Sequence, residues 1–418
     1  MELQTPRGTK DIYGEAAIRW QKLEGLARDL CARNGMGEIR TPMFEHTELF
    51  VRGVGEGTDV VQKEMYTFTD KGGRSMTLRP EMTAGVARAF IEHNLGQQTL
   101  PQRFYYIGPN FRYEKPAGGR QRQFHQFGAE LYGSAEPAAD AEMISLAYEF
   151  LKGAGLGNAT LSINSLGGPE CRAKANAALL EFLKNSYDQL CPVCQERSAK
   201  NPMRALDCKE KSCQAILADA PSPIDFLGEE CKKHFDDLKT ILDAMKIPYT
   251  IDPKLVRGLD YYTRTVFEFI DPGSGLAVCG GGRYDGLIEE VGGSSTPAVG
   301  FAMGLERIIQ MLEQEGQPPQ ANETDIFVGS MGPEGYIKSQ ALANSLRKAG
   351  IRAISDLAKR GVKAQIRYAD KIGARFSVII GDSEIQSNQA SIKEMKTGAK
   401  EDVGLDSLGE YLIGKIKA

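Results

Sequence analysis

The sequence predicts an α+β protein with an antiparallel sheet core, followed by a separate α/β domain. The segments 104–114 and 123–132 have the aromatic and apolar content of strands, and the loop between them carries the strand breakers Pro116 and Gly119. Two consecutive strands joined in this way favour antiparallel pairing. After residue 323, strand patterns alternate with helix patterns, which indicates a mostly parallel sheet.

We therefore expect two domains, residues 1–322 and 323–418, joined by the proline-rich segment 317–320. Within the first domain, residues 170–250 are rich in helix patterns and poor in strand patterns, so we interpret them as a helical insertion.

Apolar spacing and chain breakers define the other elements of the first domain. Ile18, Leu23 and Leu30 fall at helical spacing, and Gly35 is suited to end that helix. Pro80 is suited to begin another helix. The expected elements are a helix over 18–31, an extended segment over 38–42, a loop or short helix over 56–62, a hairpin of 65–69 and 75–79, helices over 80–93 and 139–151, strands over 160–164, 263–270, 276–280 and 299–303, and a helix from Gly304.

The second domain shows no cluster of titratable groups, so we expect it to bind rather than to catalyse. It holds 15 Lys and Arg against 12 Asp and Glu, a mildly basic balance that permits contact with phosphate. Its expected elements are strands over 325–328, 351–354 and 376–380, helices over 334–349 and 362–372, a hairpin around 397–398, and a last helix from Asp406.

Composition excludes several classes of protein. The chain has 418 residues, 41% hydrophobic and 25% charged, which is typical of a globular protein. No apolar run reaches the length of about 18 residues that a membrane helix requires. The first residues lack the apolar region of a secretory signal, so we expect a cytoplasmic protein.

The strand over 123–132 has one unusual face. Because side chains alternate in a strand, Phe124, Gln126 and Glu130 share one face, while Phe127 and Leu131 share the other. The second face is ordinary core. A buried unpaired carboxylate is costly, so we expect the first face to meet a ligand or water.

Arginines surround this predicted face. Arg112, Arg120 and Arg122 lie in or beside the loop, and arginine forks suit phosphate oxygens. With Arg257 and Arg307, they predict a cationic clamp on a triphosphate beside an amine-bearing group. The alternative is a half-exposed hairpin with solvated charges, and the spacing leaves it open.

Four of the eight cysteines are candidates for a zinc site. Cys191 and Cys194 have the C-x2-C spacing, whereas Cys208 and Cys213 are more loosely spaced than in a zinc ribbon. The alternative is four free thiols in a helical insertion.

Several segments resemble the class II aminoacyl-tRNA synthetases. Residues 39–45 (IRTPMFE) resemble motif 1, residues 111–126 resemble motif 2, and residues 300–307 (GFAMGLER) resemble motif 3. Residues 255–265 (LVRGLDYYTRT) and 280–285 (GGGRYD) are similar to stretches specific to the histidyl-tRNA synthetase family.

This resemblance implies a fold and an activity. The fold is a class II antiparallel sheet with a helical insertion that contacts the tRNA acceptor arm, and a C-terminal α/β anticodon-binding domain. The reaction is ATP-dependent ligation of L-histidine to tRNA(His) through a histidyl-adenylate, with Mg²⁺ on the ATP phosphates. The family also implies a homodimer, with the motif 1 proline at its interface.

The resemblance further implies roles for twelve residues. Those expected at ATP are Arg112 and Arg257 on the α-phosphate, Arg120 and Arg307 on the outer phosphates, and Phe124 and Glu114 on adenine. Those expected at histidine are Glu81, Thr83 and Gln126 on the α-ammonium group, and Glu130 and Tyr262 on the imidazole, with Tyr261 beside them. Arg257 is also expected to contact the histidine carboxylate.

Two other functions remain as alternatives. One is a regulatory paralogue of ATP phosphoribosyltransferase, which shares this catalytic fold without charging tRNA. The other is an ATP-dependent amino-acid ligase that does not use tRNA. The retained motifs and the C-terminal domain argue against both.

Overall fold

The computed structural model describes residues 3–116, 119–316 and 324–417, and these form two compact units. The larger unit holds residues 19–316 and the smaller unit holds residues 324–417. The expected linker over 317–320 and the expected boundary between residues 322 and 323 lie outside the described residues. None of the described helices has the length and apolarity needed to cross a membrane.

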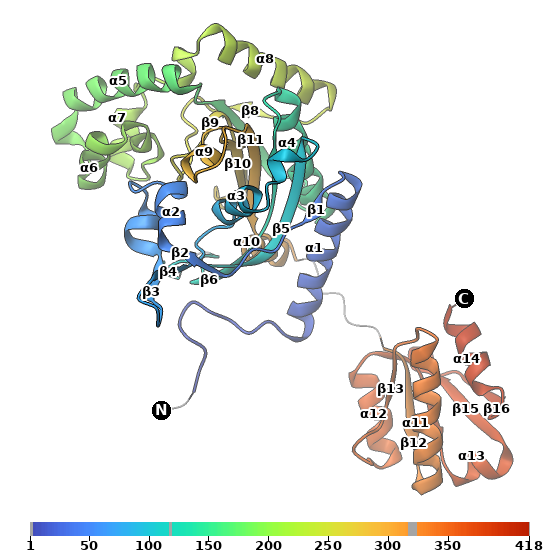
Figure 1. Ribbon diagram of the computed structural model, residues 1–418. Coiled ribbons are helices and arrows are strands. Elements are labelled where there is room, and N and C mark those ends of the chain that lie inside the picture. The colour runs from blue at the N-terminus through green and yellow to red at the C-terminus, as the bar shows by residue number, and fades with distance from the viewer. Residues whose placement is uncertain (1–2, 117–118, 317–323, 418) are drawn as a thin grey trace. The chain divides into compact units, whose positions relative to one another are not determined.

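The larger unit is built on an eight-stranded sheet with the order β1-β5-β6-β11-β10-β9-β7-β8 (Figure 1). All inner pairs are antiparallel, and only the edge pairs β1–β5 and β7–β8 among the described strands of this sheet are parallel. The strands are β1 Gly37–Glu38, β5 Gln102–Phe111, β6 Gln123–Tyr132, β7 Thr160–Ser165, β8 Thr250–Ile251, β9 Thr263–Ile270, β10 Ala277–Arg283 and β11 Ala298–Gly304. The predicted antiparallel core is confirmed.

A small second sheet with the order β2-β4-β3 lies in the chain between β1 and β5. Its strands are β2 Phe44–His46, β3 Tyr66–Thr69 and β4 Ser75–Leu78. The predicted hairpin therefore exists, and it gains β2 as a third strand.

Helices pack against the two sheets and against one another. They are α1 Gly14–Arg33, α2 Thr47–Val54, α3 Thr83–Glu92, α4 Pro137–Gly153, α9 Leu287–Glu290 and α10 Leu305–Gln314. Residues from α1, α4, α8 and α10 pack in one core with Phe127, Ala129 and Leu131 of β6, which are each at most 1% exposed. The strand alternation predicted for β6 is thus confirmed on its apolar face.

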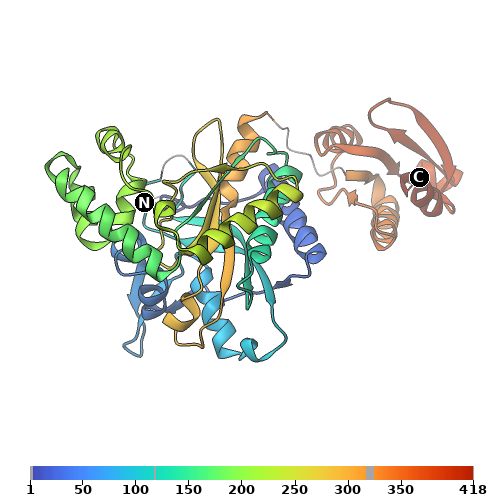
Figure 2. The ribbon, with the colours of Figure 1, turned by 90° about the horizontal axis from the view of Figure 1, so that it is seen from above.

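The expected insertion is helical. It contains α5 Pro169–Asn185, α6 Pro192–Lys200, α7 Lys211–Leu217 and α8 Glu229–Ala244. Figures 1 and 2 show α5, α6 and α7, in green, grouped at one side of the unit.

Three boundaries differ from the predictions for identifiable reasons. Strand β5 was predicted to extend to Glu114, but it ends at Phe111. The Tyr113 amide donates a hydrogen bond to the Glu64 carbonyl, at 2.7 Å, instead of pairing with β6. The strand predicted to end at Gly280 continues to Arg283, because Gly281 pairs on both sides, with Phe267 of β9 and Phe301 of β11.

The third difference is at α3, which begins at Thr83 rather than at Pro80. The Glu81 carboxylate accepts hydrogen bonds from the amides of Thr83 at 2.7 Å and Ala84 at 2.9 Å. Glu81 therefore satisfies the free amides of this helix N-terminus from outside the helix.

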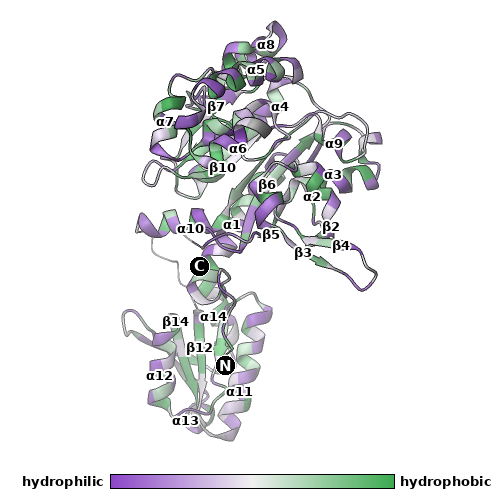
Figure 3. Ribbon diagram, turned by 90° about the vertical axis from the view of Figure 1, so that its left-hand side faces the viewer, coloured by the Kyte–Doolittle hydropathy of each residue, from purple (hydrophilic) through white to green (hydrophobic). Residues whose placement is uncertain are grey.

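The smaller unit contains a five-stranded sheet with the order β13-β12-β14-β15-β16. Its elements are β12 Thr324–Ser330, α11 Gly332–Lys348, β13 Ala353–Ser355, α12 Val362–Lys371, β14 Ala374–Ile380, α13 Asp382–Ser387, β15 Gln389–Glu394, β16 Lys400–Gly404 and α14 Leu408–Lys417. Strand β12 is parallel to both neighbours, as predicted. Figure 3 shows the apolar strands of this sheet in green and the more polar helices α11 and α12 in purple and white.

Candidate active site

All twelve residues predicted to bind histidine or ATP line one cavity of about 410 Å³ in the larger unit. Strands β6, β9, β10 and β11 contribute its floor, and loop residues within 112–114, 119–121 and 257–262 contribute its walls. The twelve are Glu81, Thr83, Arg112, Glu114, Arg120, Phe124, Gln126, Glu130, Arg257, Tyr261, Tyr262 and Arg307.

Glu130 is the buried carboxylate of this floor, with 1% of its surface exposed. Its Oε1 accepts hydrogen bonds from the Thr83 hydroxyl at 2.8 Å and the Tyr106 hydroxyl at 2.9 Å, and its Oε2 accepts a short one from Tyr284. Burial raises the pKa of Glu130 to about 8, although these three hydroxyl donors act in the opposite direction. The carboxyl is therefore poised to change its charge when a ligand arrives.

A glycine makes room for this carboxylate. Gly300 of β11 pairs directly with Glu130 of β6, and a Cβ on Gly300 would lie 1.7 Å from Glu130 Oε2. Only a residue without a side chain leaves that oxygen in place.

Three tyrosines form an aromatic wall next to Glu130. The ring centroids of Tyr261 and Tyr262 lie 4.6 Å apart, and those of Tyr261 and Tyr284 lie 5.4 Å apart. Burial raises the pKa of Tyr262, so its hydroxyl remains a neutral donor and acceptor at physiological pH. The phenol of Tyr262 and the carboxyl of Glu130 thus line the same cavity.

A second polar group lies where α3 meets the sheet. Burial raises the pKa of Glu81, and Gln126 Oε1 accepts a hydrogen bond from the Asn110 amide at 2.8 Å. Glu81, Thr83 and Gln126 together offer carboxylate, hydroxyl and amide oxygens, which suit an ammonium group.

Arginines occupy the opposite end of the cavity. Arg112 donates from Nε to the Pro80 carbonyl at 2.9 Å, and its guanidinium lies 5.3 Å from the Phe124 ring centroid. Arg307 donates to the Ala277 carbonyl at 2.5 Å. These contacts fix the directions in which both guanidinium groups point.

The arginines are close enough for their positive charges to repel one another. Burial lowers the pKa of Arg307, and the charges of Arg120, Arg112 and Arg257 lower it further. Because like charges held together favour a bound anion, this end of the cavity is suited to phosphate.

Among the residues predicted to bind ATP, two buried atoms have no hydrogen-bond partner in the described part of the chain: Arg257 Nε and Glu114 Oε2. Arg257 forms an ion pair with Glu268 through its Nη1, which leaves Nε free to donate. Glu114 Oε2 lies 3.3 Å from Arg120 Nη1 without forming a hydrogen bond to it, and is free to accept. A donor and an acceptor left unpaired in a cavity mark places for a polar ligand.

The sequence analysis missed three residues that shape the site: Tyr106, Tyr284 and Glu268. A Cβ on Gly128 would lie 2.5 Å from the Tyr106 ring, so this glycine on the polar face of β6 was a signal that a bulky side chain crosses it. Tyr284 follows the three glycines of β10 after Arg283, and Glu268 is a charged residue between the apolar Phe267 and Phe269 of β9.

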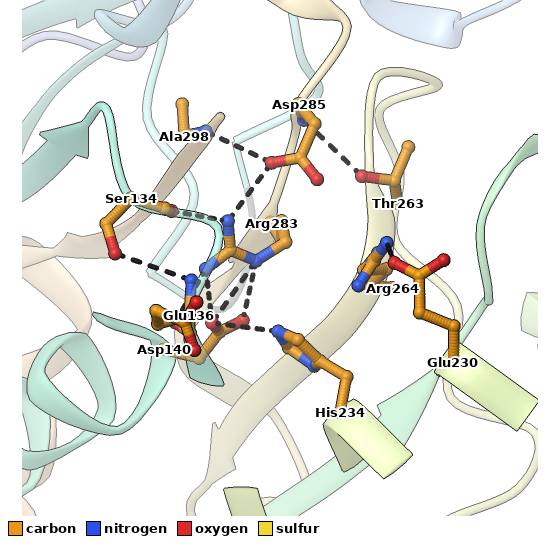
Figure 4. Close-up of polar contacts among 10 residues, drawn as sticks. All are labelled: Ser134, Glu136, Asp140, Glu230, His234, Thr263, Arg264, Arg283, Asp285 and Ala298. Atoms are coloured by element: carbon orange, nitrogen blue, oxygen red, sulfur yellow. Dashed lines mark hydrogen bonds and ion pairs between the residues drawn. The ribbon is translucent and has the colours of Figure 1, made fainter. Parts of the chain in front are cut away.

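A buried ion pair fixes the end of β10 next to Tyr284. Arg283 and Asp140 both have fully buried side chains, and Arg283 Nε lies 3.2 Å from both carboxylate oxygens of Asp140 (Figure 4). Arg283 Nη1 also donates to the Ser134 carbonyl at 2.8 Å and to Asp285 at 3.1 Å. This network holds the backbone from which Tyr284 reaches Glu130.

The four candidate zinc ligands, Cys191, Cys194, Cys208 and Cys213, lie together in the insertion, and none of them lines the cavity. The structure therefore brings the four cysteines together in one place and the twelve residues predicted to bind histidine or ATP together in another.

An antiparallel sheet in which β5, β6 and β11 carry parts of the segments 111–126 and 300–307, with the segment 39–45 leading from β1 into β2, is the architecture of class II aminoacyl-tRNA synthetases, and it assigns this chain to that class. A family model described as Histidyl-tRNA synthetase matches residues 8–308, and one described as Anticodon binding domain matches residues 327–415. The chain belongs to the histidyl-tRNA synthetase family.

Individual relatives agree over the full length. The histidine–tRNA ligase of Caldicellulosiruptor saccharolyticus is 51% identical, with 100% of both chains covered. That of Clostridium perfringens is 53% identical, over 97% of this chain and 98% of the relative. The crystal structure of apo histidyl-tRNA synthetase from S. aureus is 40% identical and has a TM-score of 0.83, with 99% of this chain and 100% of that chain covered.

Proposed function

We propose that this chain ligates L-histidine to tRNA(His) in two steps within the cavity. The carboxylate of histidine attacks the α-phosphorus of ATP, which gives histidyl-adenylate and releases pyrophosphate. The histidyl group then passes to the 3′-terminal adenosine of the tRNA, and AMP leaves. One observation carries this proposal: a buried carboxyl surrounded by hydroxyl groups shares a cavity with five arginines.

Glu130 and Tyr262 bind the two imidazole nitrogens, with Tyr261 packed beside them. The high pKa of Glu130 lets the free carboxyl be neutral, and an imidazole can take its proton because the two groups titrate in the same range. An aliphatic amino acid would leave the polar groups unpaired, which can discriminate by about 10⁴-fold or more.

Glu81, Thr83 and Gln126 hold the α-ammonium group of histidine. Arg257 then reaches its carboxylate and the α-phosphate together, which uses the free Nε that the structure leaves unpaired. Charge develops on the α-phosphate in the transition state, so Arg257 and Arg112, whose direction is fixed by the Pro80 carbonyl, supply most of the stabilisation.

Arg120 and Arg307 bind the outer phosphates, and Phe124 stacks on adenine. Glu114 Oε2, a buried acceptor without a partner, accepts from the adenine amino group.

The residues at this end also fit Mg²⁺. Glu64 lines the cavity, and burial followed by the charge of Glu114 raises the pKa of its carboxyl. A carboxylate oxygen together with ATP phosphate oxygens is the donor set that Mg²⁺ prefers, so Glu64 would hold the ion. When bound, Mg²⁺ neutralises charge on the outer phosphates.

The wider assembly is part of the same proposal. Two copies of the chain associate through the motif 1 region, where Met43 and Phe44 are each 52% exposed and Phe68 is 44% exposed. The ring centroids of Phe44 and Phe68 lie 6.4 Å apart on the small sheet, and exposed apolar residues grouped in this way favour a protein interface. The smaller unit binds the anticodon of tRNA(His), and the reaction takes place in the cytoplasm, where its tRNA substrate is used.

Pyrophosphate exchange with each of the twenty amino acids tests the proposal, followed by charging of total tRNA. We expect exchange with histidine and charging of one tRNA species. Glu130→Ala should abolish the exchange, whereas Glu149→Ala, on the outside of α4, should leave it intact. Near-normal exchange by Glu130→Ala would refute the role of that residue, and exchange without charging would favour the ligase that does not use tRNA.

A further inference from the structure

We propose that Cys191, Cys194, Cys208 and Cys213 bind one Zn²⁺ as a tetrahedral tetrathiolate site. Their Sγ atoms all lie within 4.8 Å of one another, and the Sγ atoms of Cys191 and Cys208 are 3.8 Å apart. A tetrahedron with Zn–S bonds of about 2.3 Å has S···S edges of about 3.8 Å. The thiols therefore already have the spacing that one ion would impose.

The chemistry of the group favours zinc. Four thiols are present without a histidine or carboxylate ligand in the cluster, and all four are free of disulfide bonds. A cluster of several irons binds each thiolate at a different point and spreads them more widely than 4.8 Å. A single ion that prefers sulfur in a tetrahedron satisfies the spacing.

The backbone also prepares the sulfur atoms for a metal. The Cys191 amide donates a hydrogen bond to Cys213 Sγ at 3.1 Å, across the two halves of the cluster. Hydrogen bonds of this kind stabilise a thiolate and orient it as a ligand.

The surrounding elements explain what such an ion would stabilise. Cys191 precedes α6 and Cys194 lies in its first turn, Cys208 follows the short 3₁₀ segment Pro202–Asp207, and Cys213 lies in α7. Helical segments of six to nine residues are too short to be stable alone. One ion would join all three.

The segment between the second and third cysteines reaches the wall of the active-site cavity. Arg204 donates a short hydrogen bond to the Gly258 carbonyl and itself lines the cavity. Asn201 donates to Asp260 at 2.9 Å. Both contacts are to the loop that carries Arg257.

A third contact comes from the same segment, because Arg197 donates to Asp59 at 3.1 Å, and Asp59 also lines the cavity. The zinc site thus holds a brace, residues 197–204, against the catalytic wall. This consequence, unlike the metal site itself, rests on the proposed function.

Metal analysis of the full chain, purified under reducing conditions without added zinc, tests the site. We expect one zinc per chain. Cys208→Ser should lose it, while Cys171→Ser should keep it, because Cys171 is a buried thiol of the same insertion that lies outside the cluster. Iron in place of zinc, or unchanged zinc in Cys208→Ser, would overturn the proposal.

A second measurement avoids dependence on a variant that fails to fold. The unmodified chain is stripped of metal with a chelator and titrated with Co²⁺, which should give the intense sulfur-to-metal absorption of a tetrathiolate. If the chain takes up neither Zn²⁺ nor Co²⁺ while its thiols are reduced, there is no such site.

Kinetics and proteolysis test separately whether residues 197–204 act as a brace. Removing zinc should raise the KM values for histidine and ATP and expose residues 197–204 to proteolysis, and returning zinc should reverse both. Unchanged KM values and proteolysis would overturn the brace but not the metal site. A chain that binds zinc yet shows no histidine-dependent exchange would count against the proposed function alone.

Discussion

The Tyr284 hydroxyl donates a short hydrogen bond to Glu130 Oε2, although 154 residues separate them in sequence. Strand β11 lies between their strands, and Gly300 of β11 is the position whose missing side chain lets them meet. Because Oε1 already accepts from Thr83 and Tyr106, Oε2 is the oxygen with capacity left for a ligand. In the proposed histidine site, Tyr284 would therefore control the direction of this Glu130 oxygen.

Tyr284→Phe should raise the KM for histidine in pyrophosphate exchange by about 10- to 100-fold, since a hydrogen bond to a charged group contributes about 1.5–3 kcal/mol. The KM for ATP should change little, because the hydroxyl is directed at Glu130 and not at the arginines. Tyr148→Phe, on α4, removes a hydroxyl outside the cavity and should match the wild type. A parallel rise in both KM values would mean that the variant disturbs the whole cavity.

The raised pKa of Glu130 makes the stability of the free protein depend on pH. Its folded pKa is about 8 against a usual value of 4.5, so the folded state holds a proton that the unfolded state has lost. The stabilisation is fully present below pH 4.5 and is lost as pH rises to about 8. The free energy of unfolding, measured with urea, should fall across this range more steeply for the wild type than for Glu130→Gln. Parallel curves for the two proteins would contradict a neutral Glu130.

The polar face of β6 was predictable because strand alternation is a local property. Phe124, Gln126 and Glu130 follow it, and all three line the cavity. The pattern of arginines and the family motifs indicated the remaining candidate ligand-binding residues. The sequence alone therefore predicts the twelve residues.

What could not be predicted depends on contacts between distant segments. Tyr106 and Tyr284 reach Glu130 from other strands, and nothing in their local pattern reports the pairing order β6-β11-β10. The loose spacing of Cys208 and Cys213 left the zinc site open, since only the fold brings the two sulfur pairs together. The start of α3 was misplaced because Glu81 caps the helix from outside, an arrangement that Pro80 obscured.

Two neighbouring glycines of β10 should respond differently to alanine. A Cβ on Gly280 would lie 2.0 to 2.5 Å from the guanidinium of Arg257, a flexible side chain that can move away. A Cβ on Gly281 would lie 2.3 Å from the Gly300 carbonyl oxygen, which is backbone and cannot. Gly280→Ala should therefore fold normally but displace Arg257, while Gly281→Ala should lose stability, by about 1–3 kcal/mol or more.

Pyrophosphate exchange and thermal unfolding separate these outcomes. We expect Gly280→Ala to lower the exchange rate about 100-fold, the scale of losing one fixed group that stabilises the transition state. Gly25→Ala, in the interior of α1 with open space around its Cβ, should leave the exchange rate unchanged and should not lower the unfolding temperature. Normal exchange by Gly280→Ala would show that Arg257 is not needed in its observed position.

The buried ion pair of Arg283 and Asp140 predicts a loss of stability on substitution of Arg283, and the size of that loss should depend on pH (Figure 4). Removing one partner of a buried pair leaves the other charge unpaired, so Arg283→Met should destabilise the larger unit by about 3–5 kcal/mol. Arg74→Met, at an exposed ion pair with Asp70, should change stability little. Urea unfolding monitored on the full chain measures both.

His234 makes the cost of Arg283→Met depend on pH. Its Nε2 lies 3.6 Å from Asp140 Oδ2, and burial, with a contribution from the charge of Arg283, lowers its pKa. Without Arg283, less positive charge opposes the attraction of Asp140, and the pKa of His234 rises. A base whose folded pKa has risen stabilises the fold at lower pH, so the destabilisation should be smaller at pH 6 than at pH 8. In Arg283→Met combined with His234→Gln this difference should vanish; if it persists, another group compensates the unpaired carboxylate.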